Sequence, residues 1–582
     1  MSVSSLDLGR LKRAATLTDL AAVLGVEAST LSFALYIMPV HERYHTFTVP
    51  KKRGGERIIN APNERLKFIQ KKLADILLRI ERDLEAPLRE AANNGAKKLP
   101  ILSHGFKKEL SIVTNAHKHK NRRFVFNLDL ADFFPSLNFG RVRGFFLHNN
   151  HFQLPEKVAT LLAQIACFQN ELPQGSPCSP PIANLIANIL DVRLNALARS
   201  CQCSYTRYAD DITFSTNNKE FPSHIAAQNS DGHWVPSDKL ISRISASGFR
   251  INESKTRMQF RDSRQEATGL IVNRKLNVPV EYYKETRALC HYLFHGRVPV
   301  LKIEGGSIPV TTSSLRGRLN HIFHIRGIET GHKKPEKSKY PGYFKLYAQF
   351  LDYVSFWGIE QPTIICEGKT DNIYLKNAMR ALKPTFPHFW KFVDGKEQQT
   401  INFFKYTKCS NIIQDLSGGN GQLKNLVHEF EKRTRKFRSL PKAPVIIITD
   451  VDKGATDLFK AMKKILGYTV DGDKSWYYLR DNLYIVPVPK GGRAEVAIED
   501  LFDPALLEVE LEGKKFDRTN HESDGEKVYS KFTFATKVVA ARRDEIDFGR
   551  FQPLLQAILD VQADYAQKIA HAVPSPAQAT AA

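Results

Sequence analysis

The spacing of apolar residues changes along the chain. In the first half, apolar and polar residues alternate over 44–62 and 204–216, which predicts antiparallel strands with one buried face. Helical spacing predicts short helices over residues 1–40 and longer ones over 64–84, 182–197, 281–296 and 313–326. Beyond residue 360 the apolar runs are short and continuous, as at Thr363–Cys366 and Val445–Thr449, which is typical of parallel strands buried on both faces. The pattern predicts an α+β part followed by an α/β domain with a mainly parallel sheet.

Charge distinguishes the same two parts. The net charge is +23 at pH 7. Residues 1–350 hold 51 Lys and Arg against 30 Asp and Glu, whereas residues 351–582 hold 33 against 31. A positive surplus confined to one part favours a polyanionic partner there, and nucleic acid is the default. A chain of 582 residues is too long for one core, so two to four domains are expected.

Cysteine usage and hydropathy predict the compartment. The seven cysteines are scattered, and Cys201 and Cys203 are too closely spaced for usual zinc ligands. We interpret them as free thiols in a reducing compartment, which predicts a cytoplasmic protein. The N-terminus has no apolar leader, and nowhere do 18 apolar residues follow one another, so neither secretion nor a membrane span is expected. Residues 573–582 are rich in Ala, Pro, Ser and Thr and are expected to be disordered.

Two adjacent carboxylates, Asp210 and Asp211, stand inside the apolar hairpin 204–216. A pair this close resists burial unless a divalent cation neutralises its charge. Asp129 follows the apolar run that begins at Phe124, so we place it at the end of a neighbouring strand. Carboxylates that meet in this way are what two-metal phosphoryl transfer needs, because one ion activates the attacking hydroxyl and the other stabilises the leaving oxygen.

A second set of acidic residues follows the strands of the α/β part. Glu367 and Asp371 come after one predicted strand, and Asp450 and Asp452 after another. The carboxyl ends of parallel strands form the crevice where open α/β sheets bind ligands. Alternatively, Glu367 is an acid favoured by a helix N-terminus and Asp371 is merely exposed.

Several motifs in the first 330 residues resemble those of reverse transcriptases, and among them the bacterial retron type. In the order that the family shows, they are Asp129–Phe134, Leu172–Pro177, Tyr208–Asp211, and Gly248-Phe249 with Asn252 and Lys255. Two further signatures are similar to retron ones: Asn115–His119 fits NAxxH, and Ala267–Gly269 resembles VTG with Ala for Val. The resemblance implies a right-hand polymerase with fingers, palm and thumb.

The resemblance also implies roles for individual residues. Asp129, Asp210 and Asp211 would be catalytic and hold two Mg²⁺ ions. The nucleotide-binding residues would be Phe134, below the sugar and excluding a 2′-OH, together with Arg57, Gln174 and Lys255. The expected RNA-binding residues are Asn115 and His119, for which a merely structural role is an equal alternative, and Arg316 and Arg318 on the thumb.

The later acidic residues resemble the pattern of a Toprim domain, in which a Glu follows one strand and a DxD motif a later one. Glu367, Asp450 and Asp452 would then be catalytic, and with Asp371 and Glu499 they would bind one or two Mg²⁺ ions. Lys369 or Lys490 would stabilise a scissile phosphate, and residues 418–421 would form a tight loop facing a phosphate. The spacing of Glu367 and Asp371 is closer to that of the nuclease branch than to topoisomerases or primases. The expected domains are a helical segment 1–40, fingers and palm 41–280, thumb and connector 281–355, a Toprim domain 356–572, and the tail 573–582.

The resemblance implies a retron enzyme that copies its cognate noncoding RNA, using dNTPs, into a branched RNA–DNA product. The Toprim domain is expected to be an effector nuclease in anti-phage defence, with no membrane partner, and a homo-oligomer is left open. One alternative is a reverse transcriptase whose Toprim-like domain is a non-catalytic RNA-binding or assembly module. Another is a mobile-element enzyme, which predicts a maturase or zinc-bearing segment that the cysteine spacing does not match.

Overall fold

The computed structural model describes residues 6–51, 55–93, 101–303, 306–518 and 527–572. The tail that we expected to be disordered, 573–582, lies outside the described residues. The chain divides into two compact units, residues 1–279 and 280–582, and each is described by itself.

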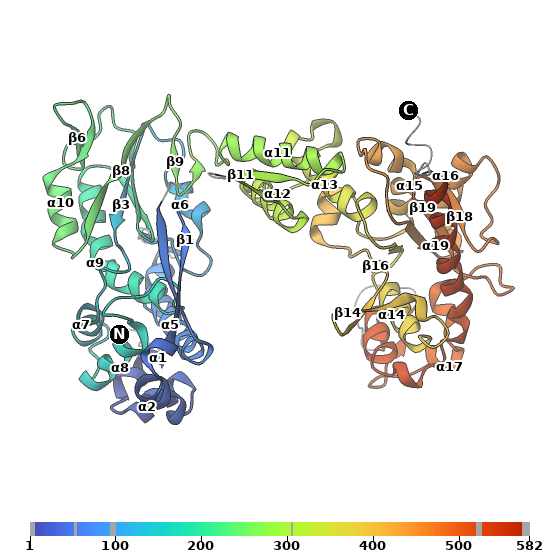
Figure 1. Cartoon of the computed structure of the whole chain (residues 1–582), viewed down its shortest axis with the longest axis horizontal. Helices are drawn as coiled ribbons and strands as arrows, with labels where there is room; N and C mark the ends of the chain where they lie inside the picture. The colour runs from blue at the N-terminus through green and yellow to red at the C-terminus, as the bar shows by residue number, and fades with distance from the viewer. Residues whose placement is uncertain (1–5, 52–54, 94–100, 304–305, 519–526, 573–582) are drawn as a thin grey trace. The chain divides into compact units, whose positions relative to one another are not determined.

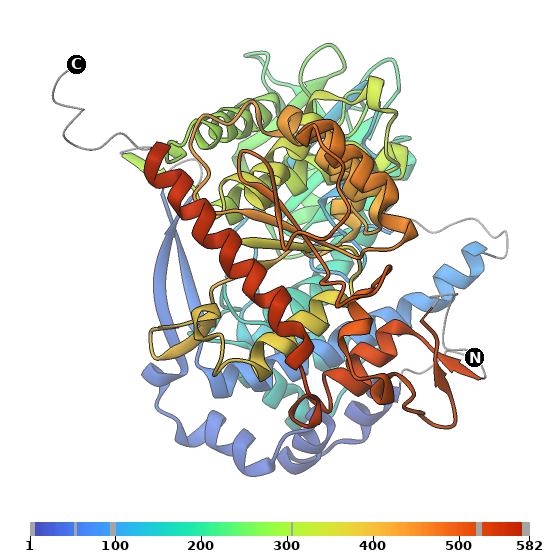
Figure 2. The same cartoon turned by 90° about the vertical axis from the view of Figure 1, so that its right-hand side faces the viewer.

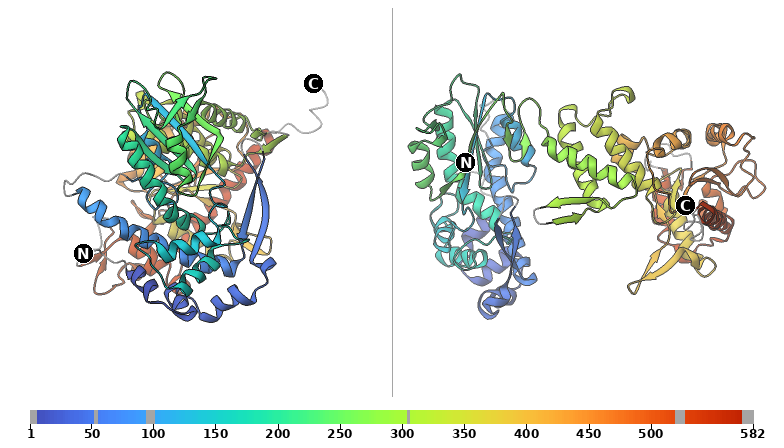
Figure 3. Two further views of the ribbon diagram at one scale, coloured as in Figure 1. Left: turned by 90° about the vertical axis from the view of Figure 1, so that its left-hand side faces the viewer. Right: turned by 45° about the horizontal axis from the view of Figure 1, so that its top comes forward.

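Unit 1 is built on a four-stranded antiparallel sheet in the order β4-β5-β3-β8. Figure 1 labels two of these strands, β3 and β8. The four strands span Ser204–Tyr208, Asp211–Thr216, Phe124–Ala131 and Arg250–Phe260, respectively. The predicted strands over 44–62 and 204–216 are confirmed, since β1 (Tyr44–Pro50) pairs with β2 (Glu56–Pro62) and β4 with β5. The hairpin β1–β2 stands away from the helices of the unit (Figure 3, left). Smaller pairs are β6 (Ala226–Gln228) with β7 (Trp234–Pro236) and β9 (Glu266–Ala267) with β10 (Leu270–Ile271).

Helices complete unit 1 around one large apolar core. They are α1 (Leu6–Arg13), α2 (Leu17–Leu24), α3 (Ala28–Ser32), α4 (Val40–Arg43), α5 (Glu64–Asn93), α6 (Ile112–Lys118), α7 (Phe139–His148), α8 (Glu156–Ala166), α9 (Ser179–Ser200) and α10 (Asp238–Ser245). The helices predicted over 1–40, 64–84 and 182–197 are confirmed. Among the described residues, no single helix is long and apolar enough to cross a membrane. Two consecutive segments, α2 and α3 with the π-helical turn that continues α3, reach that length and apolar content only together, and the chain bends sharply between them.

Unit 2 begins with a helical bundle, α11 (Val280–Phe294), α12 (Thr312–Gly327) and α13 (Gly342–Asp352), which confirms the helices predicted over 281–296 and 313–326. A hairpin of β11 (Val300–Ile303) and β12 (Gly306–Pro309) projects from it (Figure 3, right). The apolar core of the bundle includes Ile413 and Phe437 from the α/β part. Phe437 packs its ring 5.3 Å from that of Phe294 and 5.7 Å from that of Trp357. The segment that we expected to be a thumb therefore shares a core with the domain that follows it.

The rest of unit 2 surrounds a five-stranded sheet in the order β16-β13-β17-β19-β18. The strands are β13 (Thr363–Cys366), β16 (Asn402–Phe403), β17 (Val445–Thr449), β18 (Tyr477–Arg480) and β19 (Leu483–Pro487), and only β18 is antiparallel to its neighbour. One face packs against α14 (Asp371–Ala381) and α19 (Gln552–Ala572), the long helix that runs diagonally across Figure 2. The other face packs against α15 (Asn420–Thr434) and α16 (Thr456–Leu466). This confirms the predicted α/β architecture with a mainly parallel sheet, while its identity as a Toprim domain stays a prediction.

Short elements complete the C-terminal part of unit 2. They are β14 (Trp390–Val393), β15 (Lys396–Gln399), α17 (Pro504–Leu507), β20 (Lys515–Phe516), β21 (Val528–Tyr529) and α18 (Lys531–Thr533). β14 pairs with β15, and β20 with β21. The segment around α18 matters for function, because it reaches the carboxyl ends of the parallel strands.

Candidate functional site

The three aspartates of the first acidic site meet on adjacent strands of the unit 1 sheet. β4 and β5 are joined by a two-residue turn, Ala209-Asp210, and Asp211 is the first residue of β5. Asp129 on β3 is the direct cross-strand partner of Asp211. Opposite residues of an antiparallel pair project from the same face of the sheet, with Cβ atoms about 5 Å apart. A backbone hydrogen bond of 3.0 Å from Leu130 N–H to the carbonyl of Asp210 fixes the turn against β3.

One expectation about Asp129 was wrong in detail. We placed it at the end of a strand, but β3 continues to Ala131 because β8 pairs with it there. Asn252 on β8 lies opposite Asp129, and Lys255 on the same strand places its Nζ 2.9 Å from both carboxylate oxygens of Asp129. The chain therefore supplies a cation beside this buried carboxylate.

The carboxyl groups of Asp210 and Asp211 resist ionisation. The pKa of Asp210 is raised by burial and by the charge of Asp129. Burial, followed by the charges of Asp210 and Asp129, raises the pKa of Asp211 to about 7. Asp211 is exposed as a residue, but the protein atoms packed around its carboxylate leave the charged form less well hydrated than it is in water. An added cation would relieve this cost.

The donor set fits Mg²⁺, a hard ion that prefers carboxylate oxygens. Two carboxylates on adjacent strands and a third in the adjoining turn are close enough for their charges to interact, and two of them have raised pKa values that a cation would lower. Within the described part of the chain, no three His, Cys, Asp or Glu side chains are already arranged as a metal-ligand group. In the structure the ammonium group of Lys255 occupies the position beside Asp129.

The predicted nucleotide-binding residues Arg57, Phe134 and Gln174 come from three separate segments of unit 1. Arg57 is exposed on β2. Its charge partly offsets the rise in the pKa of Asp210 that burial and Asp129 cause. Phe134 follows β3 and is partly buried, with its ring 6.1 Å from that of Phe106. The carbonyl of Gln174 accepts a 2.8 Å hydrogen bond from Asn60 N–H. A Cβ on Gly175, at φ +126°, would lie 2.7 Å from the Asn60 carbonyl oxygen, so packing against β2 already requires a glycine there.

The structure argues against the expected RNA contact of Asn115 and His119. Both are buried, with exposures of 1% and 0%. His119 bonds Ser215 Oγ and Thr206 Oγ1, each at 2.7 Å, and burial lowers its pKa to about 3. Asn115 Nδ2 donates to Thr268 Oγ1 at 3.4 Å, so the two retron-like signatures contact each other. These residues hold α6 against the sheet. This supports the structural role that we considered as the alternative to RNA contact.

The two thumb arginines differ in their surroundings. Arg316 is exposed on α12 and remains a candidate for RNA contact. Arg318, by contrast, is largely covered: it pairs with Glu285, donates to Thr286 Oγ1 at 2.9 Å, and stacks over Tyr282 at 4.2 Å. Arg318 therefore ties α12 to α11 within the bundle.

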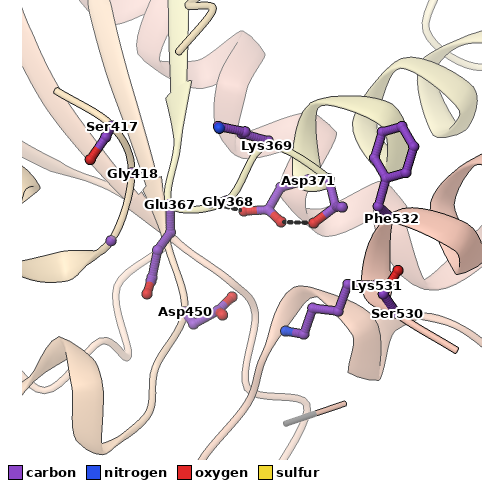
Figure 4. A pocket seen from close by; sticks show the side chains of 12 residues that line it. Glu367, Gly368, Lys369, Asp371, Ser417, Gly418, Asp450, Ser530, Lys531 and Phe532 are labelled. Atoms are coloured by element: carbon purple, nitrogen blue, oxygen red, sulfur yellow. Dashed lines mark hydrogen bonds between the residues drawn. The ribbon is translucent and has the colours of Figure 1, made fainter. Parts of the chain in front are cut away.

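The second acidic site lies at the carboxyl ends of β13 and β17. Glu367 follows β13, Asp450 follows β17, and Asp371 begins α14. Figure 4 shows Glu367, Asp450 and the end of Lys531 pointing into the same space. Asp371 and these three residues line a cavity of about 480 Å³, together with the loop 417–419. The topology thus brings together residues that are distant in the sequence.

These carboxyls hold their protons firmly. Burial, followed by the charges of Asp452 and Asp371, raises the pKa of Glu367 to about 7. Burial, followed by the charges of Asp371 and Glu367, raises the pKa of Asp450 to about 8. Asp371 is 8% exposed, which excludes the alternative of a merely exposed acid, and its carboxylate accepts from Gly368 N–H at 2.6 Å. Clustered carboxylates with raised pKa values fit Mg²⁺, because a divalent ion would offset their repulsion.

Lys531, on the short helix α18, is a site residue that the sequence analysis missed. Its Nζ lies 3.0 Å from Glu499 Oε1, and Glu499 is 1% exposed. The charges of Glu499, Asp450 and Asp371 oppose the effect of burial and leave the pKa of Lys531 raised. No local motif surrounds this lysine, so no signal in the sequence could have found it. In the structure the carboxylate of Glu499 pairs with Lys531, so its role as a metal ligand stays a prediction.

The remaining candidates take other positions. Asp452 accepts a 3.0 Å hydrogen bond from Ala455 N–H and caps the turn before α16, while its charge still acts on Glu367. Lys369 lines the cavity. Lys490 pairs with Asp473 at 2.7 Å beside a different cavity, so the structure does not bring it to the acidic site.

The comparisons with known proteins concern the first acidic site. Residues 49–293 match the family model described as "Reverse transcriptase (RNA-dependent DNA polymerase)". The chain is 34% identical over 294 residues to the retron Mx65 reverse transcriptase of Myxococcus xanthus, covering 47% of this chain and 62% of that protein. It is 34% identical over 285 residues to the retron Ec86 reverse transcriptase of Escherichia coli, covering 48% of this chain and 79% of that protein.

Among solved structures, a telomerase from Candida albicans aligns over 54% of this chain and 61% of its own, with 10% identity and a TM-score of 0.28, a likeness too weak to inform the fold. The family model ends before the second acidic site, whose residues begin at Glu367. The first acidic site, with Asp129, Asp210 and Asp211, lies inside it. By its identity to the Ec86 protein over 79% of that protein's length, the chain belongs to the family of retron reverse transcriptases.

Proposed function

We propose that this protein is the RNA-directed DNA polymerase of a retron, which copies its own structured noncoding RNA into branched single-stranded DNA. The observation that carries the proposal is the cross-strand pair Asp129 and Asp211 with Asp210 in the adjoining turn. Two Mg²⁺ ions held by these carboxylates would activate the attacking hydroxyl and stabilise the leaving pyrophosphate. The names of the curated relatives support the retron assignment.

The surrounding residues support positioning of the reactants. Phe134 would contact the sugar of the incoming dNTP and exclude a 2′-OH, while Arg57 would bind the triphosphate. Gln174 would lie along the template, and Lys255 would exchange its contact with Asp129 for one with the departing pyrophosphate. The exposed Arg316 would contact the RNA backbone.

Sequencing of the bound nucleic acid tests this proposal. The protein is purified from its native locus, and the bound material is treated with RNase or with debranching enzyme before sequencing. A short DNA joined 2′–5′ to RNA, absent from the Asp210→Asn variant, is expected. Unbranched DNA from an active polymerase would contradict the retron assignment and leave a reverse transcriptase of unknown template.

A second activity is supported by the cavity of unit 2. We propose that Glu367, Asp371, Asp450 and Asp452 form the Mg²⁺ site of a Toprim nuclease, with Glu499 as a further ligand. Bound Mg²⁺ would polarise a scissile phosphate and activate water. Lys531 and Lys369 line the same cavity, and either ammonium would stabilise the developing negative charge.

Cleavage assays with the full chain separate this from the alternative of an assembly module. The Asp210→Asn background removes polymerase activity, and Glu367→Gln with Asp450→Asn then removes the carboxylates of unit 2. Mg²⁺-dependent cleavage of DNA or RNA that the second pair of changes abolishes is expected. Cleavage by neither protein, with the RNA–DNA product still bound, would favour the non-catalytic module.

Two separate acidic sites on one chain support a role in anti-phage defence. In this proposal the polymerase and its RNA–DNA product restrain the nuclease until infection. A strain expressing the protein without its noncoding RNA is then expected to grow poorly, and Glu367→Ala is expected to restore growth. Normal growth of the strain without the RNA would count against restraint.

A further inference from the structure

Beneath the catalytic turn of unit 1 lies a buried polar network that none of the predicted site residues explains. Its centre is Arg207, which is fully buried next to Tyr208 on β4. Its guanidinium forms a two-pronged pair with Asp191 on α9, at 2.8 Å from Nε and 2.7 Å from Nη2. Removing a charge pair from water is unfavourable unless good geometry and further hydrogen bonds compensate for the lost hydration, so a network of this kind needs a reason.

The remaining donor group of Arg207 leads to the catalytic turn. Nη1 donates to the carbonyl of Ala209 at 3.0 Å and to Asn184 Oδ1 at 3.3 Å. Ala209 has φ +56°, a left-handed conformation that is strained for a residue other than glycine. Such a conformation persists only where the surroundings determine it. The bond from Arg207 to the carbonyl of Ala209 acts on the peptide that joins Ala209 to Asp210.

The segment 102–105 also contacts this turn. It runs beside β4, with hydrogen bonds of 2.8 Å from Arg207 N–H to the carbonyl of Leu102 and from His104 N–H to the carbonyl of Arg207. Asn184 Nδ2 donates to the carbonyl of Gly105 at 2.7 Å, which joins this segment to the network. A Cβ on Gly105 would lie 2.7 Å from the backbone nitrogen of Ala209, so the two backbones touch.

We propose that Arg207 is a positioning residue for the polymerase reaction: together with Asp191, Asn184 and the close approach of Gly105, it sets the geometry in which Asp210 and Asp211 receive metal ions. The inference rests on the proposed polymerase function. Arg207 is fully buried and would touch neither nucleotide nor metal, so it would act only through the backbone of the turn. Displacement of catalytic carboxylates by about 1 Å can lower a rate by about 100-fold.

Two changes approach the turn independently. Arg207→Lys keeps a positive charge opposite Asp191 but loses the forked geometry and the bond to Ala209. Gly105→Ala keeps both partners of the ion pair and places a Cβ 2.7 Å from the backbone nitrogen of Ala209, which must then shift. Gly144→Ala on α7 is the matched control, because a Cβ there meets nothing within 4 Å. All three are made in a chain that also carries Glu367→Gln and Asp450→Asn, two changes chosen to weaken metal binding by unit 2.

Steady-state kinetics, Mn²⁺ binding followed by electron paramagnetic resonance, template affinity and thermal unfolding are measured for each. Arg207→Lys and Gly105→Ala are expected to lower kcat about 10- to 100-fold and to weaken Mn²⁺ binding at least several-fold, with KM for dNTP and template affinity within about two-fold of the parent. The control is expected to match the parent throughout.

Unchanged kcat and Mn²⁺ binding in Gly105→Ala would overturn the proposal, even if Arg207→Lys is impaired, because the loss would then reflect stability alone. The proposal would also be overturned if kcat, template affinity and the unfolding temperature all fell together in both variants, because that would indicate a general loss of structure. A parent protein without polymerase activity would instead refute the proposed function, and the two failures are therefore distinguishable.

Discussion

Asp450→Asn is expected to stabilise unit 2 at alkaline pH, with a gain that shrinks as the pH falls. Burial and the charges of Asp371 and Glu367 raise the pKa of Asp450 from 3.8 to about 8. The folded state therefore keeps a proton that the unfolded chain has already lost, so the stability of the parent protein falls as the pH rises from about 4 to about 8. Asparagine does not titrate and escapes this loss.

The shift in pKa sets the size of the effect. A shift of about four pKa units corresponds to an upper limit of about 5–6 kcal/mol at about 1.4 kcal/mol per unit. The gain will be smaller, because Asp450 keeps some contact with solvent and titrates together with Glu367 and Asp371. We expect Asp450→Asn to raise the free energy of unfolding by about 1–3 kcal/mol at pH 8.5 and by under about 1 kcal/mol at pH 5.

Tryptophan fluorescence during urea unfolding measures this quantity. Three of the four tryptophans, Trp357, Trp390 and Trp476, lie in unit 2, so the signal reports mainly on that unit. Asp457→Asn is the matched control, because the pKa of this exposed residue on α16 is lowered by hydrogen bonds to lysines. Mg²⁺ should stabilise the parent protein more than the variant at pH 8.5. A gain that is equal at both pH values, or larger at pH 5, would refute the reasoning.

Four further outcomes are expected. Asp211→Asn should abolish DNA synthesis with little change in unfolding temperature, since it relieves a carboxyl whose pKa is raised to about 7; retained synthesis would contradict its role. Phe134→Ala should admit NTPs in incorporation assays, whereas unchanged dNTP selectivity would place the 2′-OH elsewhere. His119→Ala should destabilise unit 1 by about 1–3 kcal/mol in urea unfolding without weakening RNA affinity once folded; a specific loss of RNA binding would restore the contact that we expected. Phe437→Ala should destabilise unit 2 by about 3–5 kcal/mol, and fragments divided after residue 279 should be more soluble than fragments divided after residue 355; the reverse order would contradict the shared core.

The periodicity of apolar residues was sufficient to predict the main elements. The observed α9, Ser179–Ser200, extends the predicted helix 182–197 by three residues at each end, and β17 coincides with the predicted run Val445–Thr449. A helix or strand that packs on a core must bury one face or both, so its apolar residues repeat with the period of that element. For the same reason the acidic residues after β13 and β17 could be placed in one crevice before their distances were known.

The domain boundary at residue 355 illustrates what periodicity does not contain. α13 has the pattern of any core helix, and nothing in that pattern states which apolar surface it will cover. In the structure, Trp357 Nε1 donates to the carbonyl of Ser439 at 2.7 Å, and Arg438 N–H donates to the carbonyl of Phe294 at 2.8 Å. The bundle and the α/β part share one core as a result, and a connector that looks like a boundary in the sequence lies within a compact unit.

The sequence by itself determined the acidic residues and the strands that carry them, because spacing along one element is a local property. Only the tertiary structure decided that His119 is buried, that Glu499 pairs with Lys531, and that Arg207 bonds the peptide before Asp210. These contacts join residues from different elements. Their partners depend on how helices and strands pack, and the desolvation that raises the pKa values of Asp211 and Asp450 arises only once that packing is complete.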